Sequence, residues 1–199
     1  MRNQVAIALI FMVSTGQALA KDAGFFVGLG AGNAHIVEDE ITGVFLVPNQ
    51  NLDDKVGADT IYAGYKLAEN FALEVGYTKL DTAEKEFERR TDIIPPFPAL
   101  RDEDLAIESA YLSAVLTSPT RNGFGVFGLI GYSIYDVERT FSAPTRFDHI
   151  SKFTEDGVFV GIGLTYRFNE KLAARVQWTT TDAAEFRLEE SRFAVEYSF

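Results

Sequence analysis

The last eight residues of the chain alternate between two kinds of side chain. Phe193, Val195, Tyr197 and Phe199 are aromatic or aliphatic, and the residues between them are small or polar. A period of two predicts a β-strand with one apolar face. In water that face needs a core to cover it, whereas in a membrane barrel it faces lipid and ends in a girdle of aromatic rings. The end of the chain therefore predicts either a buried sheet or a lipid-facing one.

The first 20 residues have the composition of an export signal. Arg2 precedes an apolar stretch from Val5 to Val13, and Ala18-Leu19-Ala20 supplies the small residues of a cleavage site. That stretch is too short to cross a bilayer as a helix, which takes about 20 apolar residues. We therefore predict a cleaved signal peptide over residues 1–20 and a mature barrel domain over residues 21–199.

No later segment contains a long apolar run, so any insertion into a membrane must use strands. Only helices and closed barrels satisfy the polar groups of the backbone in hydrocarbon. The chain has no cysteine, which excludes disulfides and thiolate–metal sites.

Eight segments have the alternation of strands, and in most of them one face is aliphatic or aromatic. They are Gly24–His35, Thr60–Leu67, Phe71–Lys79, Leu105–Thr117, Phe124–Tyr135, Gly157–Phe168, Leu172–Trp178 and Arg192–Phe199. The opposite face of the first segment is mostly glycine, which suits a narrow interior. Both faces of the fifth segment are mixed.

Short turns alternate with long connections between these strands. The long connections are Ile36–Asp59, Leu80–Asp104, Asp136–Asp156 and Thr180–Glu190. This pattern predicts an all-β fold, an eight-stranded antiparallel up-and-down transmembrane β-barrel, with short turns in the periplasm and long loops outside. A soluble lipocalin-like barrel is the alternative, but it would expose the glycine, lysine, glutamate and arginine face of each strand and bury the aliphatic one.

Acidic residues outnumber basic ones, 29 against 18, and most of them fall in the four long connections. Such charge keeps loops solvated. Nucleic-acid binding requires a basic stripe, so we expect no nucleic-acid partner.

The inward faces of the predicted strands carry five charged residues, which are Lys66, Glu74, Arg167, Arg175 and Glu196. The interior of an eight-stranded barrel is just wide enough for its own side chains. Because unpaired charges are costly there and paired ones are tolerable, we expect a network of ion pairs that fills the lumen. A narrow gated ion channel is the alternative.

The second long connection offers candidates for contact with a partner. Phe87, Arg89, Arg90 and Phe97 are its aromatic and cationic candidates, and nearby prolines make extension of the sheet unfavourable. A solvated loop without a ligand is the alternative. No acidic group has the spacing of metal ligands, so we predict no metal and no cofactor.

The whole mature chain resembles the small eight-stranded outer-membrane barrels of Gram-negative bacteria, the outer-membrane protein A-type and opacity-type family. The matching residues are Gly24-Phe25-Phe26-Val27-Gly28-Leu29-Gly30, Gly64-Tyr65, Glu74-Val75-Gly76-Tyr77 and the terminal Phe199. The resemblance implies a monomer in the outer membrane, in contact with lipid and lipopolysaccharide, with a structural role and a surface-interaction role such as adhesion to an unknown ligand. It also implies that Phe193, Val195, Tyr197 and Phe199 form the signal read by the outer-membrane assembly machinery. The peptidoglycan-binding domain of two-domain members is not expected.

His149-Ile150-Ser151 is similar to the His-x-Ser of outer-membrane lipid A deacylases, in which a base and a nucleophile share one strand face. In that family the motif lies on a late strand beside the lipid, whereas here it is expected in the third long connection. We therefore predict that the protein is not an enzyme and has no catalytic residues, with a lipid-modifying hydrolase as a distant alternative. His35 is expected at the rim of the barrel.

Overall fold

The computed structural model describes residues 24–38, 53–86, 102–119, 121–142, 149–183 and 186–199, so the predicted signal peptide lies outside the described residues. Nine strands make up the sheet. They are β1 (Gly24–Glu38), β2 (Asp53–Ala68), β3 (Phe71–Leu80), β4 (Ala83–Glu86), β5 (Asp102–Thr117), β6 (Phe124–Ser142), β7 (His149–Arg167), β8 (Leu172–Asp182) and β9 (Phe186–Ser198). Within the described residues, no helix is long and apolar enough to cross a membrane.

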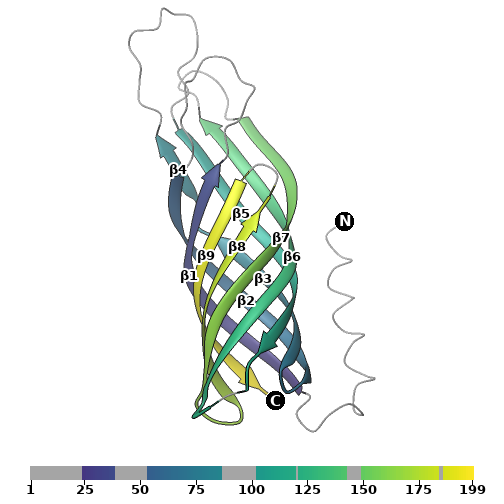
Figure 1. Cartoon of the computed structure of the whole chain (residues 1–199). Coiled ribbons are helices and arrows are strands. Elements are labelled where there is room, and N and C mark those ends of the chain that lie inside the picture. The colour runs from purple at the N-terminus through teal and green to yellow at the C-terminus, as the bar shows by residue number, and fades with distance from the viewer. Residues whose placement is uncertain (1–23, 39–52, 87–101, 120, 143–148, 184–185) are drawn as a thin grey trace, which may run out of the picture.

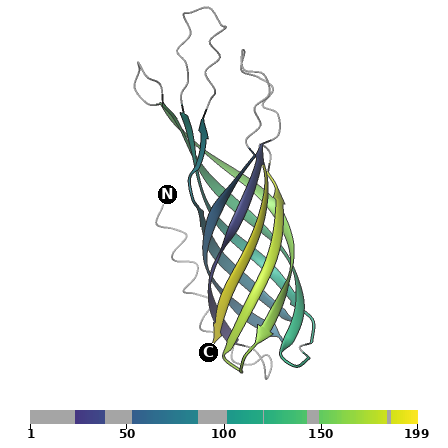
Figure 2. The ribbon, with the colours of Figure 1, turned by 90° about the vertical axis from the view of Figure 1, so that its left-hand side faces the viewer.

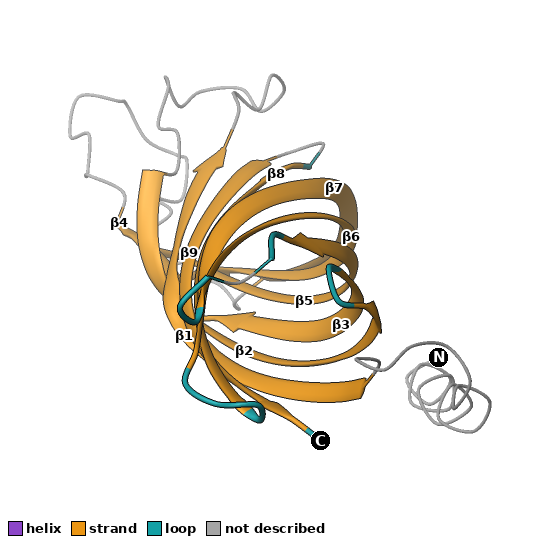
Figure 3. Ribbon diagram, turned by 60° about the horizontal axis from the view of Figure 1, so that its bottom comes forward, coloured by secondary structure: helices purple, strands orange, loops and turns teal. Residues whose placement is uncertain are grey.

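The sheet closes on itself (Figure 1). Its order is β3-β2-β1-β9-β8-β7-β6-β5-β4, and an additional pairing of β3 with β5 joins the two sides. All pairings are antiparallel, and the last strand closes on the first from Phe26↔Ser198 to Glu38↔Phe186. The view in Figure 3 shows the strands surrounding one lumen. The prediction of a closed eight-stranded barrel is confirmed, with the four-residue β4 as an added strand.

The alternation of side chains places aliphatic residues on the outside of the barrel. On β1, Leu29 is 66% exposed, whereas Phe26 is 2% exposed and points into the lumen. Exposed Ile61, Leu112 and Ile130 continue the apolar outer band on β2, β5 and β6. A soluble barrel would have the opposite arrangement. The predicted outward faces of β1, β2 and β5 are therefore confirmed, whereas for β6, whose two faces are mixed in sequence, the structure supplies the assignment.

One of the short turns shows why its sequence suits a tight hairpin. Asn122 and Gly123 have positive φ angles, of 54° and 85°. Two hydrogen bonds between Arg121 and Phe124 close the turn. Two consecutive positive φ angles define a type I′ turn, which Asn-Gly favours because its twist matches that of the flanking strands.

Every spanning strand extends further toward the loop end than the sequence predicts. Figure 2 shows this extension in the teal and green strands. The β1–β2 pairing continues to Val37↔Asp53 and the β6–β7 pairing to Phe141↔His149. The predicted connections Ile36–Asp59 and Asp136–Asp156 are therefore wrong at both ends.

The strands were underestimated because the apolar face changes sides along them. On β6 the outward residues change from Ile134 to exposed Asp136, while inward Tyr135 and Val137 are buried. At the loop end the barrel thus has a polar exterior and an apolar interior, as a water-soluble barrel does. The interior cluster, named here the apolar plug, consists of Ala34, Ile36, Val56, Ala58, Leu80, Ala83, Leu105, Ile107, Tyr135, Val137, Phe186 and Leu188.

The other two predicted connections also contain structured residues. β4 pairs with β5 from Ala83↔Leu105 to Glu86↔Asp102, so the first and last residues of Leu80–Asp104 belong to the barrel wall. The predicted connection Thr180–Glu190 is likewise shortened, because β8 reaches Asp182 and β9 begins at Phe186. Burial of Leu105 and Phe186 in the apolar plug supplies the free energy that orders these ends.

Candidate functional site

The centre of the lumen is occupied by Arg175 and its partners. The Arg175 side chain is 5% exposed, and its Nη1 donates to Glu74 Oε2 at 2.6 Å and to Glu196 Oε2 at 3.4 Å. Its Nη2 donates to Gln177 Oε1 at 3.2 Å. β8 thus supplies a cation that β3 and β9 neutralise. Three spanning strands are held in register by one guanidinium.

Lys66 joins this group from β2. Its Nζ donates to Ser198 Oγ at 2.8 Å and lies 3.6 Å from Glu196 Oε1. Glu196 is therefore shared by Lys66 and Arg175. Of the five predicted lumen residues, the structure brings Lys66, Glu74, Arg175 and Glu196 into one cluster.

The cluster continues through residues that sequence reasoning missed. Tyr111 OH donates to Glu74 Oε1 at 2.9 Å and accepts a bond of 3.2 Å from Arg192 Nη1. Arg192 Nε in turn donates to Glu190 Oε1 at 2.8 Å. The period of two on β9 could have indicated Arg192 and Glu190, since they share the face of Glu196. The charge network, as it is called below, comprises Lys66, Glu74, Tyr111, Arg175, Glu190, Arg192 and Glu196.

Aromatic rings pack against the central cation of the charge network. The guanidinium of Arg175 lies 4.5 Å from the ring centroid of Phe127 and 5.2 Å from that of Tyr62. Such rings attract a cation through their negative faces and exclude water from it. Exclusion of water strengthens the ion pairs and makes the loss of any one partner more costly.

On the loop side of the charge network the lumen contains a pocket with hydroxyl groups on its wall, among them those of Thr78, Tyr135 and Thr181. Thr60 and Thr78 share a hydrogen bond of 2.9 Å, and Tyr135 OH donates to Thr181 Oγ1 at 3.0 Å. Beyond these hydroxyls lies the apolar plug. The described part of the barrel therefore has two successive closures of different chemistry.

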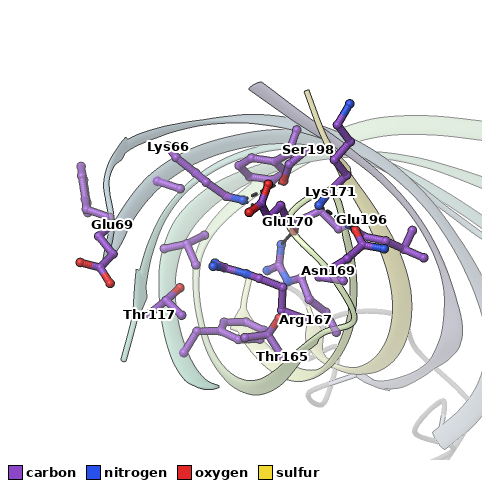
Figure 4. A pocket seen from close by; sticks show the side chains of 18 of the residues that line it. Lys66, Glu69, Thr117, Thr165, Arg167, Asn169, Glu170, Lys171, Glu196 and Ser198 are labelled. Carbon is purple, nitrogen blue, oxygen red and sulfur yellow. Dashed lines mark hydrogen bonds and ion pairs between the residues drawn. The ribbon is translucent and has the colours of Figure 1, made fainter. Parts of the chain in front are cut away.

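A pocket lies at the short-turn end of the lumen and contains Arg167 (Figure 4). The space is lined by Lys66, Thr117, Thr165 and Arg167, among others. Arg167 faces this space, as the sequence predicted, but it is exposed and makes no ion pair with any described residue. It is the one predicted lumen residue outside the charge network.

The remaining candidates lie elsewhere. Phe87, Arg89, Arg90 and Phe97 fall outside the described residues. His149-Ile150-Ser151 begins β7 and is not in a connection, which corrects its predicted place. Half-buried Ser151 is on the same strand face as inward-pointing Phe159, so the Ser151 hydroxyl does not lie on the outer face of the barrel. His35 is not the end of its strand, since β1 continues to Glu38.

Comparison with known proteins identifies the family. The profile of a family described as "Outer membrane protein beta-barrel domain" matches residues 5–199. The chain belongs to this family. Curated proteins give no significant match.

Solved outer-membrane barrels share its fold. Ail, the attachment invasion locus protein of Yersinia pestis, solved with the heparin analogue sucrose octasulfate, is 12% identical, with a TM-score of 0.56 over 88% of this chain and 99% of Ail. The N-terminal barrel of Pseudomonas aeruginosa OprF is 14% identical, with a TM-score of 0.57 over 88% and 98%. Neisserial surface protein A is 18% identical, with a TM-score of 0.56 over 89% and 99%. At these identities the likeness concerns the fold.

In this outer-membrane barrel the terminal strand has its predicted outward face. Phe193, Val195, Tyr197 and Phe199 are all exposed on the apolar exterior. The Phe199 N–H donates to the Phe25 carbonyl at 3.0 Å, and the Tyr197 and Phe199 rings lie 5.2 Å apart, edge to face. The end of the chain is thus held at the seam between β1 and β9, with its ring exposed at the short-turn end of the barrel.

Replacing Phe199 with alanine is expected to reduce assembly in cells far more than the stability of refolded protein. The free energy of unfolding should fall by only about 1–2 kcal/mol, which is the contribution expected from burying one interfacial ring. Phe168→Ala is the matched control, because Phe168 is 58% exposed at the same end and Phe199 is 76% exposed. Outer-membrane yield and detergent refolding are measured for both variants. Equal yields for Phe199→Ala and Phe168→Ala would refute the terminal assembly signal.

Proposed function

We propose that this protein is a closed outer-membrane barrel whose functional part is its loop end, where it contacts surface ligands. The observation that carries the proposal is the double closure of the lumen. The charge network fills the middle of the lumen, and the apolar plug fills the lumen at the loop end. Because side chains fill the lumen at these two levels, we favour a structural and surface-contact role over transport.

The extended strands support a role as a rigid carrier of loops. β6 and β7 each have 19 residues, about 9 more than a tilted span requires. At about 3.3 Å per residue and the usual tilt, these residues raise the loops by roughly 20 Å. Polar pairs on their outer surface, such as Lys152 Nζ to Glu138 Oε2 at 2.5 Å, suit a wall that stands in water.

The charge of the chain limits the kind of ligand. Ail binds the heparin analogue sucrose octasulfate, which is a polyanion. The present chain has a formal net charge of −11, and its lumen pairs carry equal numbers of both signs. Like charges across an interface oppose association. We therefore expect a neutral or basic macromolecular surface as the ligand, in addition to outer-membrane lipid and lipopolysaccharide around a monomeric barrel.

Removing residues 87–101 tests the role of the loops without opening the barrel. Because Glu86 pairs with Asp102, an Asn-Gly turn can join them and leave β4, Ala83 and Leu105 in place. Cells displaying the full barrel are screened against immobilised proteins and heparin, and the shortened barrel is compared on each ligand found. We expect at least a tenfold loss of protein binding in the shortened barrel and no binding of heparin by either. Equal binding by both barrels would contradict the proposal for this loop.

Planar-bilayer recordings on the same two proteins separate this role from that of a channel. We expect at most small and infrequent conductances for both, because the charge network and the apolar plug are retained in both proteins. A large steady conductance of the full barrel would instead support the gated channel.

A further inference from the structure

The short-turn end of the lumen forms an open vestibule with polar and cationic residues near its mouth and an apolar inner wall. Its wall carries Lys66, Thr117, Thr165 and Arg167, and buried Phe26, Ala72, Val115 and Phe127 supply apolar surface deeper inside. The charge network closes its inner end at Arg175 and Glu196. A ligand that enters from this side is therefore held at the mouth and does not pass through.

Arg167 and Lys171 are the two cations lining the vestibule that have no ion-pair partner among the described residues. Lys66 and Arg175 are neutralised by Glu196 and Glu74. Arg167 lies two residues after Thr165, which pairs with Arg175 of β8, on the same inward face of β7. It adds to the positive charge of a vestibule that Lys66, Lys171 and Arg175 also line. No described carboxylate lies within ion-pair distance of it, whereas closer to the middle of the lumen Arg192 pairs with Glu190.

The acidic residues of the rim do not supply the missing partner. Glu69 and Glu170 lie on the short turns and are exposed, and neither forms an ion pair with Arg167. In Figure 4 the guanidinium of Arg167 points across the open mouth, and Glu69 lies on the far side with its carboxylate directed away. The guanidinium is thus presented to the solvent-filled mouth.

We propose that the vestibule binds a small organic carboxylate, such as the C-terminus of a short peptide. A guanidinium offers a planar pair of N–H donors that matches a carboxylate in two parallel hydrogen bonds. The hydroxyls of Thr117 and Thr165 add donors on the same wall, and the apolar surface of Val115 and Phe127 accommodates the hydrocarbon part. Short turns face the periplasm in this class of barrel, so the ligand comes from that compartment.

Titration of the refolded full chain in a zwitterionic detergent tests the site. The probe is N-acetyl-alanyl-alanine, followed by calorimetry, and its methyl amide and inorganic phosphate are the comparison ligands. We expect Arg167→Gln to weaken binding of the peptide carboxylate at least tenfold, because a charged donor is lost. Arg121→Gln is the matched control, since Arg121 is also exposed in a short turn at this end and does not line the vestibule.

Further outcomes decide between binding modes. The methyl amide is expected to bind at least tenfold more weakly than the carboxylate. Phosphate is expected to bind more weakly than the peptide, because it has no hydrocarbon part to contact the apolar inner wall. Thr165→Val, expected to weaken binding severalfold, tests the wall independently if Arg167→Gln does not refold. The proposal is overturned if the wild type does not bind the peptide, if Arg167→Gln binds it equally well, or if phosphate or the methyl amide binds as tightly.

Discussion

Replacing Glu74 with alanine is expected to lower the free energy of unfolding by about 3–5 kcal/mol. The side chains of Glu74 and Arg175 are 2% and 5% exposed, and their ion pair is 2.6 Å long. Without Glu74 the guanidinium retains Glu196 at 3.4 Å, while Tyr111 loses its acceptor. The cost arises mainly from leaving a desolvated charge incompletely paired, and it greatly exceeds the value of an exposed pair.

Unfolding by urea in lipid vesicles, followed by the fluorescence of the single tryptophan, measures this difference. Glu138→Ala, which removes an exposed partner of Lys152, is the matched control and should cost less than about 1 kcal/mol. The double variant Glu74→Leu, Arg175→Met should recover at least half of the loss, since neither charge then remains buried. Equal effects for Glu74→Ala and Glu138→Ala would show that the charge network does not stabilise the barrel.

Gly32→Ala is expected to destabilise the barrel by about 3 kcal/mol, at the upper end for overpacking. A Cβ atom at Gly32 would lie 2.0 Å from the Ser191 carbonyl oxygen and 2.8 Å from the Arg192 Cα. Both are backbone atoms of β9, so the strain cannot be relieved by rotating a side chain. It would instead separate β1 from β9 where the barrel closes.

Gly128→Ala is the control for this prediction. The nearest atom to a Cβ at Gly128, the Gly161 carbonyl oxygen, is at 3.8 Å, an ordinary contact. The free energy of unfolding of Gly128→Ala should stay within about 1 kcal/mol of the wild-type value, because alanine fits there and loses less backbone entropy on folding than glycine. The fraction of protein that migrates as the folded form on unboiled gels, together with urea midpoints, reports both variants. A Gly32→Ala barrel as stable as Gly128→Ala would mean that the seam tolerates displacement.

The closed barrel could be predicted because its strongest signal is local. Alternation with a period of two assigns a strand and its faces from neighbouring residues alone, as on β1 and the clean apolar face of β7. The same local signal failed at the loop end. There the period of two persists, but the outer face meets water and the inner face is buried in the apolar plug. The apolar residues therefore lie on the inner face, opposite to their place in the rest of the barrel.

The charged lumen was only partly predictable for a different reason. The alternation assigns Lys66, Glu74, Arg175 and Glu196 to the inward face, but Glu74 and Arg175 are 101 residues apart. Their contact depends on the register of every strand between them, which turn lengths and bulges determine. Glu190 was missed because the terminal strand was assigned too short, and Arg192, the first residue of the predicted strand, was not assigned to the inward face that it shares with Glu196.

By itself, then, the amino-acid sequence determined that the chain forms strands with an apolar exterior and a glycine-lined, charged interior, because these properties depend on neighbouring side chains. Only the tertiary structure decided which charges pair and where the apolar interior begins, and it left Arg167 at the mouth without an ion pair among the described residues. These features depend on distances across the lumen, which closure of β1 on β9 sets. Closure makes each side chain's environment a property of all the strands together.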